Sequence, residues 1–524
     1  MMPLRSHFRG FSPMLWAWIG FALLLAPLSN DSIDMDEAQT WDYARQANVS
    51  DFCHELRNDQ NSEAQMPLGM FSFWAWSRAF GTGELAMRTL NLLWAAIVLV
   101  ALARVGRQIS IPWLPFLFAI QPFTWYCMNQ ARTPLMQMAG GALLLAGSLP
   151  HFQRRQPGGE SAAYLCAGAI LLCGASMLGL IPLVAVFSGM AVHGMWRRVQ
   201  LPVSGKILAF ATVTILVSLG IYYGLTLLRG AGGAKIWSVS PANMLFAVYE
   251  FLGFQGFGPG RQELRAIMKG LVPAGGGLLF IPGLLLLASA YCCLFSTAYK
   301  SWMTRDFCPA SLSPRQGESR EPAEANSARC RLFPAWLFGV GVTVLSLSLL
   351  FVLAFIVGFP FWGRHLSGAF PFWILTLAVT IRWAQQGAWR RLGRVAGSGI
   401  FVLLLVSSLL LRFSPLHRHD DYRGAVAEAL RISSGGGIVW WVADHSGGVY
   451  HGLPLADKFT DRRGEIQFSM NRAGSGNPDA IIISRPDNFD VAGTATGLIA
   501  TGAYRKTRSL QAFEVWEKIS MGNR

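Results

Sequence analysis

Charged residues are scarce in this 524-residue sequence: only 14% of its residues are charged, against about a quarter in an average soluble domain. The shortage is uneven, because long stretches carry no charge and the charged residues gather between them. A chain that is 52% hydrophobic with this pattern is typical of a multi-pass membrane protein. The net charge of +15 does not indicate a nucleic-acid partner, because most arginines lie in short clusters between apolar segments, where they orient membrane helices.

Sequence motifs for cysteine-ligated metal sites and for nucleotide binding are also absent. The eight cysteines form no C-x-x-C pair and no spacing with histidine that is typical of a zinc site. The glycine-rich segment 253–260 lacks the Lys-Ser/Thr pair of a phosphate-binding loop. No internal repeat is visible, although many transporters have one. These absences argue against a cysteine-ligated metal centre, a nucleotide-binding loop and a repeat-built transporter.

What is present is a series of apolar segments long enough to cross a membrane, which takes about 20 residues and sometimes as few as 17. With the N-terminus in the cytoplasm, the arginine clusters fall in alternate loops, as the positive-inside rule requires. The first segment has no convincing cleavage site, so we interpret it as an uncleaved helix rather than a signal peptide. We therefore predict a polytopic α-helical protein of the cytoplasmic (inner) membrane with about eleven spans, at 13–30, 86–104, 111–127, 133–149, 161–175, 177–195, 206–228, 274–296, 332–357, 366–383 and 396–412.

This topology divides the chain into a membrane domain, 1–412, and a C-terminal extracytoplasmic domain, 413–524. Within the membrane domain, 31–85 is the first outer loop, and 297–331, rich in Pro, Ser and Glu, is predicted to be a flexible cytoplasmic linker. In the C-terminal domain, "DDYRGAVAEALRISSGGG" predicts a helix ended by glycines, while "IVWWVAD", "AIIISRP" and "FEVWEK" predict strands. We expect a small α/β domain there.

The first outer loop begins with four carboxylates, in "DSIDMDEAQTWDYARQ". Asp34 and Glu37 have the spacing of a capping box, so these acids are interpreted first as the start of an interfacial helix that carries Tyr43. One acid is enough for a cap, however, and the excess points to chemistry. With a second interfacial helix opened by Pro67, the loop would enclose a groove that has Asp36 and Glu37 at its mouth. A carboxylate there can act as general base toward a hydroxyl acceptor.

Several segments, in order along the chain, resemble one protein family. "MDEAQTWDYARQ…EAQMPLGMFSFWAWSRAFGTGELAMRTLNLLWAA" resembles the start of bacterial family 39 glycosyltransferases, which are GT-C-fold relatives of protein O-mannosyltransferases and lipid A aminoarabinose transferases. The D-E pair of the family is Asp36-Glu37 here, its Pro segment is 65–67, and its entry to the next span is 81–88. The His-Pro of the family's Pro segment is absent.

Later segments carry the same resemblance. "QPFTWYCMNQARTPLMQMAGGALLLA" resembles the family's P…Y-x-x-E-A-R stretch, with Gln130 where the family has an acid and Arg132 at its Arg. "FPFWGRHLSGAFPFW" resembles the late R-Y-L-x-x-x-x-P motif, with Arg364, His365 and Pro371. "DDYRGAVAEALR…GGIVWW" resembles the start of the tail domain in such proteins.

The resemblance implies an enzyme that moves a sugar from a polyprenyl-phosphate carrier to a hydroxyl of a lipid, glycan or protein, with inversion, on the outer face of the membrane. It implies that Asp36 is the general base and that Glu37 orients Asp36 or a donor hydroxyl. A leaving phosphate needs cations in a site of low dielectric constant, preferably arginine. The residues expected at the phosphate are Arg132, Arg364 and His365. The residues expected to make further substrate contacts are Asp34, Gln130 and Tyr43.

Other interpretations stay open at this point. No cofactor is required, but Asp34 and Asp36 form an Asp-x-Asp that suits a divalent cation. The alternative interpretation of Arg132 and Arg364 is that they position helix ends at the interface. A transporter or flippase for a lipid-linked solute is one alternative function, although the spans carry almost no charge. A non-catalytic GT-C-like assembly subunit is another, because Gln130 replaces an acid and the His-Pro is missing.

Overall fold

Two compact units make up the chain in the computed structural model. Unit 1 comprises Met1–Leu28, Asn48–Ser72 and Arg88–Ser414, and unit 2 comprises Ser29–Ala47, Phe73–Met87 and Pro415–Arg524. The acidic start of the first outer loop therefore belongs with the C-terminal region. The structure describes residues 12–59, 61–153, 159–195, 203–230, 239–260, 277–303, 320–359, 361–386, 389–455, 468–469, 477–490 and 493–519.

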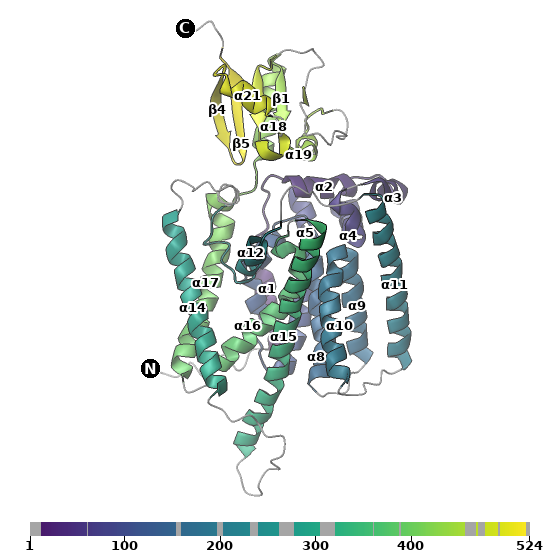
Figure 1. Cartoon of the computed structure of the whole chain (residues 1–524), viewed down its shortest axis with the longest axis vertical. Coiled ribbons are helices and arrows are strands. Elements are labelled where there is room, and N and C mark those ends of the chain that lie inside the picture. The colour runs from purple at the N-terminus through teal and green to yellow at the C-terminus, as the bar shows by residue number, and fades with distance from the viewer. Residues whose placement is uncertain are drawn as a thin grey trace. The chain divides into compact units, whose positions relative to one another are not determined.

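Unit 1 is helical (Figure 1). Helices α4 (Pro67–Phe80) and α5 (Glu84–Ile109) have residues in both units. The other helices of unit 1 are α1 (Pro13–Leu23), α3 (Val49–Asn58), η1 (Ser62–Gln65), α6 (Leu114–Ala119), α7 (Pro122–Met128), α8 (Pro134–Phe152), α9 (Gly159–Ala175), η2 (Met177–Gly179), α10 (Leu180–Met195), α11 (Val203–Leu228), α12 (Pro241–Phe251), α14 (Gly277–Met303), α15 (Arg320–Val357), η3 (Gly363–Ala369), α16 (Phe370–Ala384) and α17 (Arg390–Phe413).

Six helical stretches of the described residues are long and apolar enough to cross a membrane. They are Glu84–Ile109, Lys206–Leu228, Ile281–Lys300, Leu332–Val357, Gly363–Ala384 and Arg390–Phe413. Pro13–Leu23, Gly159–Ala175 and Met177–Val192 are apolar but shorter. The protein is therefore a multi-pass membrane protein. Each of the eleven predicted spans overlaps a helix or a pair of helices among the described residues, but α1 ends at Leu23, before the predicted end of the first span at residue 30. The number of spans stays a prediction.

Segment 111–127 is not the single helix that its apolar composition predicts. Helix α6 ends at Ala119 and α7 begins at Pro122, with Ile120 and Gln121 between them. Proline has no backbone N–H to continue a helix, and its fixed φ suits the first position of a new one. The segment therefore breaks into two short helices at this proline.

The prediction of a flexible linker over 297–331 is wrong at both ends. Helix α14 continues to Met303, and α15 begins at Arg320. Residues 320–331 are rich in Ala, Glu and Arg, which favour helix, and they extend the apolar helix that follows. The centre of the predicted linker, 304–319, lies outside the described residues.

Close helix contact in unit 1 depends on small residues. A Cβ atom on Gly140 of α8 would lie 2.7 Å from the backbone nitrogen of Leu172 in α9. A Cβ atom on Gly168 of α9 would lie 2.7 Å from the carbonyl oxygen of Gly140. Both distances are shorter than real Cβ contacts, so only glycine allows these two backbones to approach as they do. Such small-residue contacts are a common way to pack membrane helices.

Unit 2 contains a five-stranded sheet with the order β2-β1-β3-β5-β4. Strands β1 and β3 are parallel, and the other neighbours are antiparallel. The strands are β1 (Val439–Val442), β2 (Phe468–Ser469), β3 (Ala480–Ile483), β4 (Tyr504–Leu510) and β5 (Phe513–Lys518). The remaining helices are α2 (Met35–Ala44), η4 (Pro415–His417), α18 (Tyr422–Ser434), α19 (His445–Tyr450), α20 (Pro486–Phe489) and α21 (Thr494–Ala500). Helix α18 and strands β1, β3 and β5 lie in the segments predicted for them.

Alternating side chains of the sheet build a hydrophobic core on each face. On one face Trp441 and Phe513 pack against Tyr422 of α18, and the Tyr422 and Phe513 ring centroids are 4.8 Å apart. Met35 of α2 packs against this same core. On the other face Ile481 packs in a second cluster with residues of α21. Helix α2 is thus held by the C-terminal region, and Figure 1 labels the elements concerned.

Candidate active site

The N-terminus of α2 has the predicted capping box. Asp34 is the N-cap residue, and its Oδ1 accepts a hydrogen bond of 3.0 Å from the Glu37 backbone N–H. Glu37 Oε2 in turn accepts a bond of 3.2 Å from the Asp34 backbone N–H. The two residues are 4% and 0% exposed. The capping interpretation is confirmed for this pair, and it makes Asp36 the first-turn carboxylate that stands outside the box.

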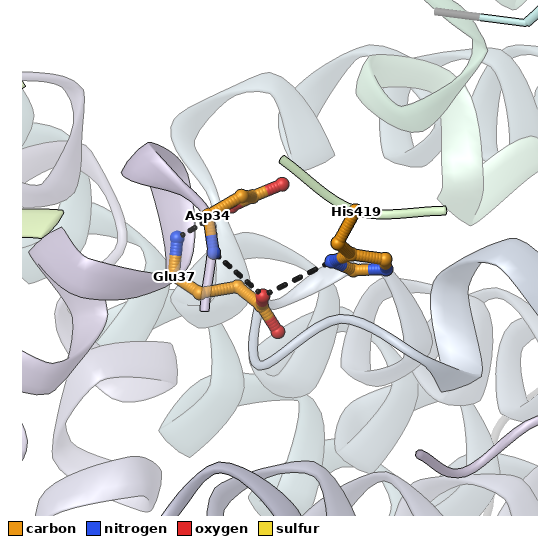
Figure 2. Close-up of side chains that lie close together, drawn as sticks. All are labelled: Asp34, Glu37 and His419. Carbon is orange, nitrogen blue, oxygen red and sulfur yellow. Dashed lines mark hydrogen bonds and ion pairs between the residues drawn. The ribbon is translucent and has the colours of Figure 1, made fainter. Parts of the chain in front are cut away.

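A histidine from the C-terminal region meets Glu37. Nδ1 of His419 lies 3.5 Å from Glu37 Oε2, and the His419 side chain is only 8% exposed. Figure 2 shows the His419 ring beside the Glu37 carboxylate. One ligand atom each from Asp34, Glu37 and His419 lies within 4.8 Å of the other two. The structure therefore groups Asp34 with Glu37 and His419, and not with Asp36, as potential metal ligands.

A buried arginine, Arg485, pairs with the residue that follows His419. Arg485 forms an ion pair with Asp420, whose side chain is 2% exposed and which follows His419 directly. The carboxylates of Asp34 and Asp36 also act electrostatically on Arg485. Arg485 has a φ of +49°, a value that residues other than glycine rarely adopt. Its ion pair and its burial therefore hold a backbone conformation that is intrinsically unfavourable.

Replacing Arg485 with Met is expected to lower the free energy of unfolding by about 3–5 kcal/mol, because it leaves the Asp420 carboxylate buried without its partner. The control is Lys506→Met, which removes an exposed ion pair with Glu514 and should cost no more than about 1 kcal/mol. Thermal unfolding of the purified full-length variants measures both effects. Equal stability of the two variants would show that the Arg485 pair is not structural.

Two further groups of unit 2, Asp444 and His451, have pKa values that differ from their ordinary values. Burial raises the pKa of the Asp444 carboxyl from 3.8 to about 7, and the nearby Asp36 and Asp42 carboxylates add to the rise. Burial lowers the pKa of His451 from 6.5 to about 4, with Arg423 contributing. Nε2 of His451 lies 3.1 Å from the hydroxyl oxygen of Ser32. Both groups are therefore mainly uncharged over part of the range from mildly acidic to neutral pH.

These two groups are expected to change stability with pH in opposite directions. Between pH 3.8 and about 7 the folded protein retains a proton at Asp444 that the unfolded chain releases, so stability falls as the pH rises. Between about pH 4 and 6.5 the unfolded chain binds a proton at His451 that the folded protein does not, so stability rises with pH. In the wild-type protein these two opposite changes of stability with pH largely cancel.

Single variants separate the two effects. Asp444→Asn keeps an acceptor for the Gly447 N–H, which caps α19, but it removes the falling component. Its unfolding temperature should therefore rise from pH 4 to 6.5, whereas that of His451→Gln should fall from pH 4 to 7. Thermal unfolding across this range is the measurement. Parallel curves for the two variants would contradict the assignment of either group.

The predicted residues on α2 differ in exposure. Asp36 is partly exposed in the first turn, and its backbone carbonyl accepts a hydrogen bond of 3.5 Å from the Thr40 hydroxyl. Tyr43 is 3% exposed and is buried near the end of α2. Of the predicted catalytic pair, Asp36 is thus a residue of intermediate exposure, whereas Glu37 is fully buried. A substrate contact by Tyr43 stays a prediction.

In unit 1, Arg132 is buried against a carboxylate that the sequence did not single out. Arg132 Nη1 lies 2.6 Å from Glu63 Oε1, and the two side chains are 9% and 1% exposed. The turn before Arg132 is fixed by Asn91, whose Nδ2 donates a bond of 2.6 Å to the Gln130 carbonyl oxygen. The Gln130 side chain is buried, and its amide has no hydrogen-bond partner within the described part of the chain. Such a buried amide is a candidate for contact with a bound molecule.

Arg364 and His365 lie in η3, next to another buried acid. The N–H of Gly363 donates a hydrogen bond of 2.6 Å to Glu250, which is 4% exposed. The backbone N–H of Trp362 donates a bond of 3.0 Å to Nδ1 of His365. A neutral His365 that accepts at Nδ1 carries its proton on Nε2, so this nitrogen is a donor. Arg132 thus pairs with Glu63, and Arg364 follows the glycine whose N–H is bonded to Glu250.

Sequence reasoning missed several of these partners. The residues concerned are Glu63, Glu250, His419, Asp420, Asp444 and Arg485. Glu250 is a single acid within a largely apolar segment, which is a signal that burial and pairing were to be expected, whereas Glu63 lies in a polar segment and carries no such signal. The "HRHDDY" run at 417–422 also concentrates titratable groups directly before a helix. Arg485 carries no comparable local signal.

These observations define a multi-pass helical membrane protein with a buried carboxylate–histidine–arginine network in a second unit that contains an α/β sheet. No protein-family model and no curated protein matches the sequence. Among solved structures, the chain is similar over 97% of its length to 98% of ArnT from Cupriavidus metallidurans bound to undecaprenyl phosphate, with 13% sequence identity and a TM-score of 0.43. It is also similar over 97% of its length to 97% of the same protein in the apo state, with 12% identity and a TM-score of 0.41.

Proposed function

We propose that this protein is a membrane glycosyltransferase that moves a sugar from a polyprenyl-phosphate carrier to a hydroxyl acceptor on the outer face of the cytoplasmic membrane. The observation that carries the proposal is the different position of each acid at the start of α2. Asp34 and Glu37 form the capping box, and Asp36 is a residue of intermediate exposure in the same first turn, outside the box. The proposal uses the membrane orientation predicted from the arginine clusters, with the N-terminus in the cytoplasm and the C-terminal region outside it.

In the proposed reaction Asp36 is the general base. It takes the proton of the acceptor hydroxyl as that oxygen attacks the anomeric carbon of the donor sugar. The bond from the anomeric carbon to the phosphate oxygen breaks, and polyprenyl phosphate leaves with the electron pair. One displacement inverts the configuration of the anomeric carbon. Glu37 fixes the start of α2 through its bond to the Asp34 N–H and thereby positions Asp36.

The leaving phosphate is assigned to the predicted cations of unit 1. A guanidinium carries five N–H donors, so the contact of Arg132 with Glu63 is compatible with a second anionic partner. Donors that are already held in place stabilise developing charge without reorganising during the reaction. Arg364 and the Nε2 donor of His365 have the same proposed role. Gln130 is proposed as a substrate contact because its buried amide has no partner within the described residues.

Transfer from a panel of radiolabelled polyprenyl-phosphate sugars tests this function. The purified full-length protein in nanodiscs is supplied with membrane lipids and glycans as acceptors, with and without a chelator. We expect release of polyprenyl phosphate and labelled acceptor in equal amounts from at least one donor, and no requirement for a metal in this step. A protein that binds these donors but releases no phosphate from any of them would refute the transferase proposal. Transport of an unmodified donor across vesicles would indicate a flippase instead.

A further inference from the structure

We propose that Asp34, Glu37 and His419 bind one divalent transition-metal ion of the Zn²⁺ class. Each residue offers a ligand atom, and these atoms lie within 4.8 Å of one another. The three side chains are buried. They come from two distant parts of the sequence, the start of α2 and the segment that leads into α18. Figure 2 shows the three side chains together. This site differs from the Asp34–Asp36 pair that the sequence suggests.

The geometry of these three side chains is close to that of a metal site. Zinc binds histidine nitrogen and carboxylate oxygen at about 2.0–2.2 Å, so two ligands of one tetrahedral ion lie about 3.3–3.6 Å apart. Nδ1 of His419 and Oε2 of Glu37 are 3.5 Å apart, which already fits two ligands of the same ion. The separations of up to 4.8 Å in the group exceed this range, so we expect small side-chain movements to bring all three atoms onto one ion.

The kinds of ligand favour a transition metal over calcium or magnesium. Imidazole suits zinc and its neighbours in the first transition series, whereas calcium and magnesium prefer oxygen atoms alone. Two carboxylates and one neutral imidazole would carry two negative charges and balance the two positive charges of the ion. Three protein ligands leave a fourth position for water or another ligand, as zinc sites with three protein ligands do.

The capping box is compatible with metal binding and would support it. Each carboxylate has two oxygens with about four acceptor sites in all, so a backbone N–H and a metal can share one group. The hydrogen bonds between Asp34 and the Glu37 N–H, and between Glu37 and the Asp34 N–H, fix the orientation of both carboxylates. Hydrogen bonds from an outer shell orient metal ligands in the same way.

A bound ion would join the start of α2 to the segment before α18 within unit 2. The capping box alone explains why Asp34 and Glu37 are paired, but it does not explain why His419 is buried against the same carboxylate. An ion pair between Glu37 and His419 is the rival explanation, and it does not include Asp34, whose carboxylate belongs to the same group of potential ligand atoms. The metal site goes beyond the transfer reaction proposed above, and binding is measured without any sugar donor.

The test is metal binding to purified full-length protein in nanodiscs after removal of bound metal with a chelator. Zn²⁺ is titrated in competition with a chromogenic chelator, and Co²⁺ is titrated as a spectroscopic probe of a site with nitrogen and oxygen ligands. We expect one equivalent of either ion per chain and a higher unfolding temperature with the ion bound.

Three variants each remove one ligand, and two of them keep the helix cap. Glu37→Gln retains an acceptor for the Asp34 N–H, and Asp34→Asn is also a good N-cap. Loss of an outer-shell partner weakens metal binding by about 10- to 100-fold. Because Glu37→Gln, Asp34→Asn and His419→Gln each remove a direct ligand, each should weaken metal binding by more than this. His417→Gln, two residues away, is the matched control and should bind as the wild type does.

Two results would overturn the metal site: a wild-type protein with no specific equivalent of Zn²⁺ or Co²⁺, or undiminished affinity in all three ligand variants. A lower unfolding temperature in His419→Gln, together with a wild-type unfolding temperature that neither Zn²⁺ nor Co²⁺ changes, would establish the ion pair instead. Absence of metal binding in a protein that still transfers sugar would refute this site alone, whereas metal binding without transfer would refute the proposed function alone.

Discussion

Asp36→Asn is expected to lower the turnover of sugar transfer by about 10²- to 10⁴-fold, which is the usual contribution of a general base. Asparagine has nearly the shape of aspartate but cannot accept the acceptor's proton. Since Asp36 stands outside the capping box of α2, the helix and its N-cap should be retained. We expect the unfolding temperature and the binding of donor to stay close to the wild-type values, so that the loss appears in turnover.

The matched control for this prediction is Asp51→Asn in α3. Asp51 is an exposed first-turn acid that bonds to the nearby Asn48, as a helix-start residue does. It should transfer sugar at the wild-type rate. The comparison is made by following labelled acceptor over time at saturating donor. Transfer by Asp36→Asn at the rate of Asp51→Asn, in protein that is expressed and inserted, would remove Asp36 from the mechanism.

The buried Arg132–Glu63 ion pair of unit 1 is expected to contribute strongly to stability. Glu63→Gln leaves the Arg132 guanidinium buried without its partner and should lower the free energy of unfolding by about 3–5 kcal/mol. Arg132→Gln should cost a similar amount, and the double variant should cost less than the sum of the two, because it removes both charges. Thermal unfolding in one detergent, or denaturant unfolding in nanodiscs, gives the double-mutant cycle.

An exposed ion pair of the same unit provides the control. Arg104 and Glu160 are 2.8 Å apart, with side chains 25% and 73% exposed, so Glu160→Gln should cost no more than about 1 kcal/mol. Equal costs for Glu63→Gln and Glu160→Gln would contradict the prediction that burial makes the Arg132 pair important.

The same variants separate the structural role of Arg132 from its proposed role toward the phosphate. Arg132→Lys keeps the charge and can still reach Glu63, but it loses the forked donors that suit a phosphate. We expect this variant to be much more stable than Arg132→Gln and yet to bind the polyprenyl-phosphate donor at least about tenfold more weakly, which corresponds to about 1.4 kcal/mol. Unchanged donor binding in Arg132→Lys would leave Arg132 with a purely structural role.

Several features of this protein followed from the sequence alone because they depend on short-range physics. The spacing of Asp34 and Glu37 predicts the capping box, since both bonds close within one helical turn. Apolar runs predict where helices lie, because their backbone groups must be satisfied inside the membrane. Short runs of apolar, β-branched and aromatic residues predict the strands around Trp441 and Ile482, because such residues suit a buried strand.

Local patterns were less reliable where two signals compete. Apolar composition predicts one helix over 111–127, but the missing N–H of Pro122 ends that helix and begins another. Polar composition predicts a linker over 297–331, but the helix-favouring residues from 320 onward join the apolar helix that follows. In both segments the average composition concealed the residue type that decides the backbone.

Only the tertiary structure decided which charged groups meet. His419 lies beside Glu37, and Arg485 pairs with Asp420, although the sequence gives no spacing that links these residues to α2 or to one another. Arg132 meets Glu63 in the same way in unit 1. A capping box or a helix is a property of neighbouring residues, whereas the partner of a buried charge depends on how distant segments pack. The sequence by itself therefore determined the helices and the candidate base, and packing determined the counter-charges and the ligand set around them.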